Sequence, residues 1–299
     1  MQYSTFAAID IGSYDVILEI FEISKKQGIR SVDKICHRME LGKDTYTLGK
    51  IRPEMEEELC RVLADFVRIM EGYRVDDYRA TASSAISEAS NSLYVLGKIH
   101  QLTGLSVTVL SNSEQRFLSY KALAAMEDNF NKIIEKGTAI LDLDGGSFQI
   151  SLFDKDALVT TQNIRMGSLR IRERLAGIQS ETEHYEEMVE ELIWNEVSSF
   201  KKMYLKDRKI ENIMLIGDVF TDSVYQNIEE KTTKIISREN FNTWYEKIIR
   251  QSPMELAVKL GIPLENASLM YPSAVIYKCL IDMMGAEHIW IPGVHMTRG

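Results

Sequence analysis

Long apolar runs, paired cysteines and metal-binding histidine spacings are missing from this 299-residue sequence. No segment approaches the roughly 18–20 apolar residues that a membrane-spanning helix needs, so no membrane partner is expected. The cysteines Cys36, Cys60 and Cys279 show no Cys-x-x-Cys spacing, and their odd number argues against a disulfide framework. The five histidines are isolated from one another and show no metal-ligand spacing.

Basic residues are also scarcer than acidic ones. Lys and Arg number 35 against 44 Asp and Glu, which gives a formal net charge of −9. A chain with this balance has no bulk attraction for a polyanion, and no nucleic-acid partner is expected. A phosphorylated ligand would therefore need local backbone donors and a cation. The opening residues MQYSTFAAID carry neither a basic region nor a cleavage site, which favours a cytoplasmic location.

The first half of the chain alternates strand and helix patterns. Residues 5–23 predict two strands around a Gly-Ser turn, and residues 28–41 predict a third strand. A loop containing Gly and Thr is expected next, followed by an amphipathic helix over 54–72, where apolar residues recur every three or four positions. The later elements of this half are a strand at 77–81, a helix at 92–102, a strand at 106–110 and a helix at 113–127.

The pattern then restarts near the middle of the chain. Residues 137–154 predict a second strand–turn–strand whose core, DLDGGSFQISLF, mirrors DIGSYDVILEIF with one inserted residue. This duplication predicts an α/β protein of two related domains with mixed sheets, residues 1–127 and 128–299. The remaining elements are a helix at 181–202, a strand at 211–218, helices at 238–250, 253–260 and 270–284, and a strand at 288–292.

The two Gly-containing turns are the main candidates for a ligand site. Where no Cβ intervenes, several backbone N–H groups can approach one anionic oxygen. Asp10 and Asp142, at the strand ends beside the turns, are predicted to orient waters around a Mg²⁺ ion that bridges phosphate oxygens. Each turn alone could be an ordinary hairpin, whereas a pair facing one interdomain cleft favours function. The predicted phosphate-binding residues of the turns are Gly12, Ser13, Gly145, Gly146 and Ser147.

Five segments resemble, in order, those of the Ppx/GppA exopolyphosphatase family. AAIDIGSYDVILEIFE is similar to its first phosphate hairpin, A-x-D-h-G-S-N-S, and LDLDGGSFQISLF to its second, D-I-G-G-G-S-T-E-L. ASSAISEASN (82–91) looks like A-T-x-A-h-R-x-A-x-N, and LSNSEQRFLSY (110–120) like I-S-G-x-E-E-A-R-L-I-Y. NIRMGSLRIRERL (163–175) is similar to the signature h-G-x-x-R-h-x-E, with Arg170 at the arginine position.

The resemblance implies a duplicated actin-like (ribonuclease H-like) fold with an interdomain cleft. It also implies Mg²⁺ as the cofactor, polyphosphate or a guanosine polyphosphate as the ligand, and phosphate binding by Arg170. If residues 165–174 formed a strand, Arg170, Arg172 and Arg174 would share one face because their spacing is alternate, whereas Arg165, five positions before Arg170, would lie on the other face. A homodimer is one option for the assembly.

The departures from the family pattern fall on polar residues. Gln115 aligns with the family's catalytic glutamate, thought to activate the attacking water, and Gln149 with the glutamate that closes the second hairpin. An amide orients a water but does not accept its proton as a carboxylate does. Glu114 would replace Gln115 only through a one-residue register shift. Ser87 stands at the position of a phosphate-binding arginine, so a bidentate contact is lost.

Three functions stay open at this point. The first is a phosphohydrolase that attacks the terminal phosphoryl group of polyphosphate or guanosine pentaphosphate, with weakened turnover. The second is a regulatory paralogue that binds such a ligand and does not turn it over. The third, an actin-like kinase or ATPase, is disfavoured because residues 217–221 do not supply the Gly-Gly-Thr loop that binds adenosine.

Overall fold

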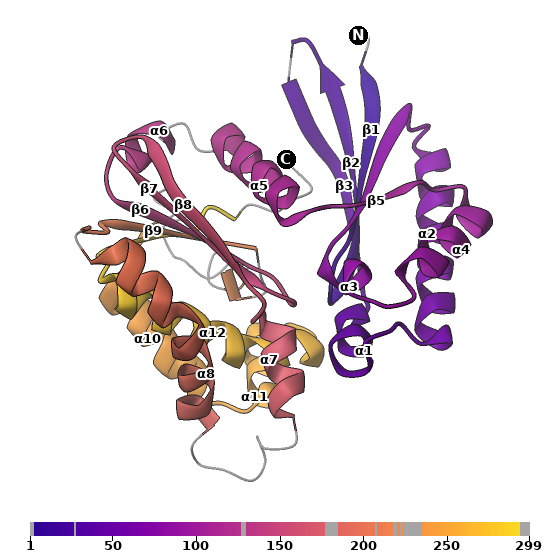
Figure 1. Cartoon of the computed structure of the whole chain (residues 1–299). Coiled ribbons are helices and arrows are strands. Elements are labelled where there is room, and N and C mark those ends of the chain that lie inside the picture. Colours follow the sequence, from indigo (N-terminus) through magenta and orange to yellow (C-terminus); the bar gives the residue numbers. More distant parts are fainter. Residues whose placement is uncertain are drawn as a thin grey trace. The chain divides into compact units, whose positions relative to one another are not determined.

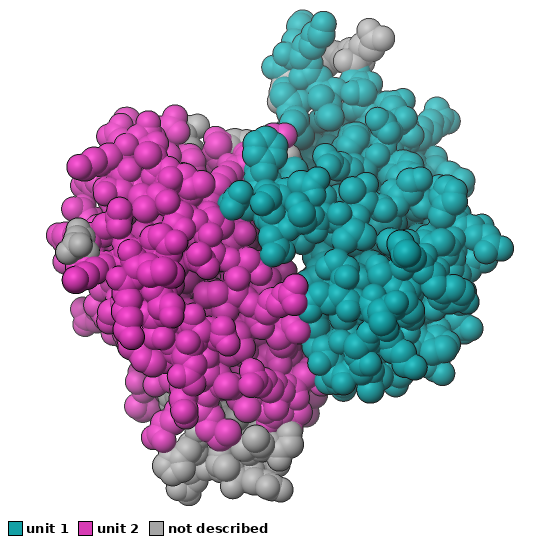
Figure 2. All heavy atoms as spheres, in the orientation of Figure 1, with its two compact units in different colours: residues 1–118, 296–298 teal, residues 119–295, 299 magenta. Residues whose placement is uncertain are grey.

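The structure is a computed structural model that describes residues 3–26, 28–126, 130–176, 185–206, 208–217, 220, 221, 223 and 235–293. The chain divides into two compact units, unit 1 up to Leu118 and unit 2 from Ser119 (Figure 2). This division falls before residue 127, the end of the first domain predicted from the sequence. Helix α5 (Asn112–Met126) crosses it, because Ala122 and Leu123 at its carboxyl half pack in the core of unit 2.

A five-stranded mixed sheet forms the framework of unit 1. Its strand order is β3-β2-β1-β4-β5, with β1, β2 and β3 antiparallel and β4 and β5 parallel to β1 (Figure 1). The expected strands of this half are thereby confirmed. Their bounds are Ser4–Ile11 for β1, Asp15–Ser24 for β2, Gly28–Arg38 for β3, Asp77–Ala82 for β4 and Val107–Val109 for β5.

The core of unit 1 lies between this sheet and helix α2 (Pro53–Gly72). Leu59, Leu63 and Phe66 recur at helical spacing on α2 and are buried in one cluster with the β1 residues Ile9 and Ile11. Pro53 occupies the first helical turn, where its missing N–H costs nothing. The other helices of unit 1 are α1 (Leu41–Leu48), α3 (Ser84–Ser87) and α4 (Ser92–Thr103).

The segment expected as a loop after β3 contains helix α1, so that expectation is wrong. The buried carboxylate of Asp44 accepts hydrogen bonds from the backbone N and from Nε of Arg52, both at 2.9 Å. Thr45 Oγ1 donates to the carbonyl of Ala85 at 2.7 Å. Local helix propensity in LGKDTYTL is modest, and these contacts from outside the helix stabilise it.

Unit 2 repeats the sheet of unit 1 and adds an edge strand. Its order is β10-β11-β9-β6-β7-β8, in which β6, β7 and β8 are antiparallel and β9 and β11 run parallel to β6. Order and directions match those of unit 1, which confirms the duplicated α/β fold class. The bounds are Thr138–Leu143 for β6, Phe148–Asp154 for β7, Ala157–Ile164 for β8, Asn212–Ile216 for β9, Ile235–Ser237 for β10 and His288–Trp290 for β11.

Helix α12 (Leu264–Met284) is the most deeply buried helix of unit 2 among the described residues, and Tyr277 on it donates to the carbonyl of Ile216 at 3.2 Å. It begins six residues before the expected start at 270. Residues 168–175 form helix α7 and not a strand, so the arginine face of a strand does not exist. The other described helices are α6 (Phe130–Ile134), α8 (Tyr185–Phe200), a π-helical turn (Lys201–Leu205), α10 (Arg238–Ile249) and α11 (Pro253–Leu260).

In the part of the chain that the structure describes, none of the helices combines the length and apolarity required to cross a membrane.

Candidate functional site

The turn of unit 1 lies between β1 and β2. Asp10, near the end of β1, faces Ile17 on β2 in the antiparallel register. The backbone N–H of Gly12 donates to the carbonyl of Asp15 at 2.9 Å and closes the turn. A Cβ at Gly12 would lie 2.9 Å from Asp15 Oδ1, so this position accepts a larger residue only if Asp15 moves.

The Ser13 hydroxyl, predicted to donate to phosphate, lies in an internal hydroxyl cluster. Ser13 is 3% exposed. Its Oγ is 2.7 Å from the hydroxyl of Tyr46 on α1 and 3.4 Å from Oγ of Ser84 on α3, and the last two oxygens are 2.8 Å apart. The backbone N–H of Gly42 also donates to the Ser13 carbonyl at 2.7 Å. These bonds fix the turn to both helices, and Tyr46 and Ser84 are partners that the sequence did not reveal.

Tyr14 and Asp15, which replace the family's Asn-Ser pair, share one arginine partner. Arg38 at the end of β3 forms an ion pair with Asp15, with 2.8 Å between Nη1 and Oδ2. The same guanidinium lies over the Tyr14 ring, 5.7 Å from its centroid. Arg38 therefore neutralises the negative charge that Asp15 brings to the turn.

The segment 82–91 connects β4 to α4 and contacts the loop after α1. Asn91 accepts from the N–H of Ile51 at 3.0 Å and donates to its carbonyl at 2.8 Å, so this asparagine holds the backbone of the loop. Ser87 is exposed at the end of α3, where its backbone N–H donates to the Ser83 carbonyl. The family pattern has an arginine at this position, with a guanidinium group that carries a charge. Ser87 has only a short, uncharged hydroxyl donor in its place.

Glu114 caps the amino end of α5. Its carboxylate accepts from the N–H and the hydroxyl of Ser111, both at 2.8 Å, and its own N–H points back to the Ser111 hydroxyl at 3.3 Å. This is a capping box, and the Ser-x-x-Glu spacing was a signal for it in the sequence. The backbone N–H and then the hydroxyl of Ser111 lower the pKa of Glu114. Gln115 follows in the first turn and is half-buried.

The turn of unit 2 has the same length as the turn of unit 1. Ile11 pairs with Val16 and Leu143 with Phe148, so four residues separate the paired strand ends in both hairpins. The N–H of Asp144 donates to the carbonyl of Ser147 at 2.9 Å, as Gly12 does to Asp15. The inserted residue expected from the sequence therefore does not exist: Asp144 corresponds to Gly12, and Ser147 to Asp15.

The amino end of helix α7 is hydrogen-bonded to the backbone of this second turn. The N–H groups of Ser168 and Arg170 donate to the carbonyls of Asp144 and Gly145 at 3.2 and 2.9 Å, and Arg170 Nε donates to the carbonyl of Gly146 at 2.8 Å. A Cβ at Gly167 would lie 2.4 Å from the Asp144 carbonyl oxygen. Gly167 thus permits the close approach of helix and turn, and Arg170 holds the turn backbone.

Asp142 is the most perturbed carboxyl of the candidate site. Ser119 on α5 donates to its Oδ2 at 2.7 Å. Surrounding protein desolvates the carboxyl and raises its pKa to about 6, although part of the side chain stays accessible; the Ser119 hydroxyl opposes this rise and Asp144 adds to it. Gln149 lies directly opposite on β7, so the two side chains project from one face of the sheet.

Gly217, just after β9, permits the close approach of its backbone to the other carboxylate oxygen of Asp142. A Cβ there would lie 2.6 Å from Asp142 Oδ1 and 2.7 Å from the Leu143 carbonyl oxygen, and Gly217 has a φ of +102°. Ser119 and Gly217 are site residues that the sequence reasoning missed. The rest of the segment 217–221 is only partly within the described residues, and Asp218 and Val219 lie outside them.

The oxygen atoms around Asp142 suit Mg²⁺. Within the described ranges no group of three or more His, Cys, Asp or Glu side chains forms a metal site. Mg²⁺ does not need one, because it commonly binds through one or two carboxylates, waters and the phosphates of a substrate. Asp142, which is only partly buried, fits that pattern. Asp10 belongs to the other unit, and the meeting of the two aspartates across one cleft stays a prediction.

Comparison with known proteins places these features in a family. The model of the Ppx/GppA phosphatase family matches residues 19–296. The chain is 21% identical to the bifunctional 3-dehydroquinate synthase/phosphatase of Fusobacterium nucleatum, over 95% of this chain and 44% of that protein. It is 25% identical to exopolyphosphatase 1 of Mycobacterium leprae, over 48% of this chain and 41% of that protein. The matched regions span less than half the length of these relatives.

Solved structures share the fold. The exopolyphosphatase from Cytophaga hutchinsonii superposes with a TM-score of 0.87 at 16% identity and covers 99% of this chain and 96% of its own. The Ppx/GppA family member from Aquifex aeolicus superposes with a TM-score of 0.74 at 18% identity, over 97% and 95% of the two chains. With a family match over nearly its whole length, the chain belongs to the Ppx/GppA phosphatase family.

Proposed function

We propose that this chain is a phosphohydrolase with weakened turnover that cleaves phosphoanhydride bonds of inorganic polyphosphate or of a guanosine pentaphosphate. The observation that carries the proposal is the environment of Asp142. A carboxyl at the end of a strand lies beside a Gly-Gly turn and accepts a hydrogen bond from the Ser119 hydroxyl. Its second oxygen lies close to Gly217, where an added Cβ would come within 2.6 Å of it. Membership of a phosphatase family supports the hydrolase class.

In the proposed reaction the residues position the substrate and stabilise the charge on the transferred phosphoryl group. These two effects dominate the catalysis of phosphoryl transfer. The backbone N–H of Gly145 would bind a phosphate oxygen, and that of Gly146 would do so by exchanging its present acceptor, Asp144 Oδ1, for phosphate. The carboxylate of Asp142 would hold Mg²⁺. Mg²⁺, when bound, supplies the positive charge that a chain of net charge −9 lacks. Gln115 would orient the attacking water without taking its proton, which is the reason to expect weakened turnover.

A regulatory paralogue that binds the same ligand is the second candidate, and the state of Glu114 favours it. The one carboxylate adjacent to Gln115 accepts two hydrogen bonds from Ser111 and has a lowered pKa, so it is a poor proton acceptor. The two candidates differ in turnover and share the binding site.

Phosphate release in the presence of Mg²⁺ separates them. We expect slow release from polyphosphate or guanosine pentaphosphate by the natural protein. We expect Gln115→Glu to raise the rate at least about tenfold, because general-base catalysis typically contributes about 10²–10⁴-fold. Ser87→Arg on that background should mainly lower the substrate concentration at half-maximal rate. Glu114→Gln is the matched control, which removes a neighbouring carboxylate and should leave the rate unchanged.

Robust release by the natural protein that Gln115→Ala leaves intact would show that the water is positioned elsewhere. Ligand binding without release in any variant would replace the hydrolase with the regulatory paralogue. Absence of both binding and release would reject the proposed ligand class.

A further inference from the structure

The loop between β3 and α1 is fixed to the turn of unit 1 through the backbone. The N–H of Met39 donates to the carbonyl of Tyr14 at 3.1 Å, and the N–H of Gly42 donates to that of Ser13 at 2.7 Å. The N–H of Ser13 has no acceptor among the described residues, although Ser13 is almost completely buried. A buried backbone donor without an acceptor is rare in folded proteins, and an anionic ligand would satisfy it.

Arg38, the last residue of β3, brings a guanidinium group to the same turn. It pairs with Asp15 through Nη1 at 2.8 Å and lies over the Tyr14 ring. A guanidinium carries several N–H donors in a planar fork, and within the described part of the chain only Nη1 of Arg38 donates a hydrogen bond. The side chain is 34% exposed, so its remaining donors are available to an anionic oxygen.

The carboxylate of Asp15 connects this guanidinium to the glycine of the turn. Its Oδ2 accepts from Arg38, whereas its Oδ1 lies 2.9 Å from the position that a Cβ on Gly12 would take. Glycine leaves room for an anionic oxygen, and in this chain the protein's own carboxylate fills that room. A phosphate group that displaced the carboxylate would therefore meet the same guanidinium.

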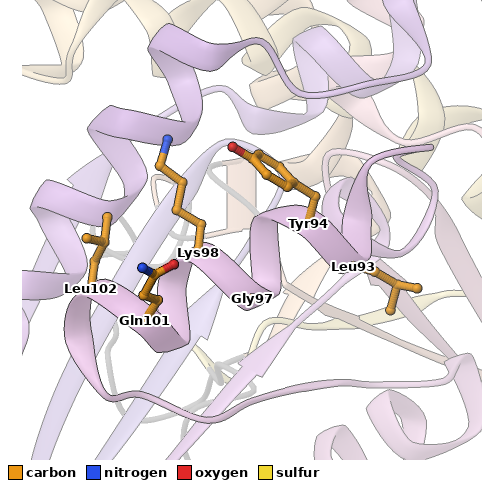
Figure 3. Close-up of a pocket in the computed structure, with 6 residues that line it drawn as sticks. All are labelled: Leu93, Tyr94, Gly97, Lys98, Gln101 and Leu102. Atoms are coloured by element: carbon orange, nitrogen blue, oxygen red, sulfur yellow. The ribbon is translucent and has the colours of Figure 1, made fainter.

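Two other cations of unit 1 are engaged in the packing of helices. Arg52 uses Nε and Nη2 on the buried carboxylate of Asp44. Lys98 is the one charged residue that lines a hollow of about 500 Å³ along α4 (Figure 3), and its ammonium group pairs with the buried Glu56 on α2 at 2.6 Å. Arg38 contacts the turn directly, so it is better placed than either to meet a phosphate there.

We infer that Arg38 binds a phosphate group of the ligand at the turn of unit 1, and that Asp15 competes with this phosphate for the guanidinium. The inference rests on the proposed function and adds a cationic contact to it, since the family's phosphate-binding arginine is replaced by Ser87. Guanidinium–phosphate contacts are strong because they are charge-assisted and commonly bidentate. A terminal phosphoryl group carries more negative charge than a carboxylate does, so it wins the competition.

Titration calorimetry with inorganic tripolyphosphate and Mg²⁺ tests both parts. Asp15→Asn removes the competing charge and should tighten binding at least about fivefold. Arg38→Gln in the Asp15→Asn background should then weaken binding at least about tenfold, because hydrogen bonds between charged groups contribute more than neutral ones. Arg38→Lys in the same background should give an intermediate affinity, since lysine keeps the charge and lacks the planar fork.

The ion pair at the other end of the same two strands provides the matched control. Arg30 on β3 pairs with Glu22 on β2 at 2.6 Å, as Arg38 pairs with Asp15. The two arginines lie roughly 26 Å apart along β3 at the usual rise of a strand. Glu22→Gln and Arg30→Gln make the same changes of charge and should leave the affinity unchanged. Circular dichroism should show that every variant is folded.

Equal affinities of Asp15→Asn with and without Arg38→Gln would overturn the phosphate contact and leave the proposed function intact. An affinity of Asp15→Asn no higher than that of the natural protein would overturn the competition. An equal loss caused by Arg30→Gln would mean that only the net charge of the chain matters, which would also overturn the contact. Absence of tripolyphosphate binding by both the natural protein and Asp15→Asn would instead reject the proposed function, and this inference with it.

Discussion

Replacing Asp142 by Asn should stabilise unit 2 and abolish its proposed Mg²⁺-dependent ligand binding. In the folded chain desolvation raises the pKa of Asp142 from 3.8 to about 6, against the lowering effect of the Ser119 hydroxyl. An acid with a higher pKa in the folded state holds its proton more tightly there, so its ionisation destabilises the fold. The cost is small below pH 4, grows as the pH rises from 4 to 6, and is complete above pH 7.

The magnitude follows from the pKa difference. One pKa unit corresponds to about 1.36 kcal/mol, so a rise of about two units costs at most about 3 kcal/mol. Asn keeps an oxygen that accepts from Ser119 but does not ionise. The free energy of unfolding of Asp142→Asn should therefore exceed that of the natural protein by up to about 3 kcal/mol at pH 8, and by less than about 1 kcal/mol at pH 4.

Urea unfolding in metal-free buffer at several pH values measures this difference. Tryptophan fluorescence reports unit 2 alone, because Trp194, Trp244 and Trp290 all lie in it. Ser119→Ala is the complementary variant: it removes the hydroxyl that lowers the pKa, so it should destabilise the unit more at pH 8 than at pH 4. A gain for Asp142→Asn of the same size at both pH values would refute the reasoning, and so would a loss at pH 8.

Three further changes test individual contacts. Gly167→Ala should destabilise unit 2 by about 3 kcal/mol in urea unfolding followed by tryptophan fluorescence, since its Cβ would overlap the Asp144 carbonyl; a cost below about 0.5 kcal/mol would contradict this packing. Tyr46→Phe should cost unit 1 about 1 kcal/mol in calorimetry by removing the central hydroxyl of its cluster, and an unchanged transition would mean that water replaces it. Gly146→Val should abolish polyphosphate binding in titration calorimetry, whereas Gly72→Val, at a position with open space, should not; binding retained by a folded Gly146→Val protein would reject the turn as an anion site.

Much of the fold could be predicted from the sequence because its elements have strong local patterns. The alternation of apolar residues in the hairpins and the three-to-four spacing on α2 each depend on residues close together in the chain. Duplication was visible for the same reason, since each half opens on a hairpin. Helix α1 was missed because its stability comes from contacts with Arg52 and Ala85 and not from its own propensity.

The candidate site, too, could be predicted from the sequence only in part. The sequence by itself determined the residue types: a glycine turn in each half, an aspartate beside each, and glutamines and a serine at three family positions that usually carry charge. It also contained the Ser-x-x-Glu signal that assigns Glu114 to a helix cap.

Only the tertiary structure decided what those residues touch. It gave both turns one length, enclosed the Ser13 hydroxyl between Tyr46 and Ser84, and set Ser119 against Asp142. Tyr46 and Ser84 lie 33 and 71 positions from Ser13, and Ser119 lies 23 from Asp142. Such contacts arise from the packing of sheets and helices. The residues that meet are far apart in the chain and follow no periodic pattern, so the sequence alone does not predict that they touch.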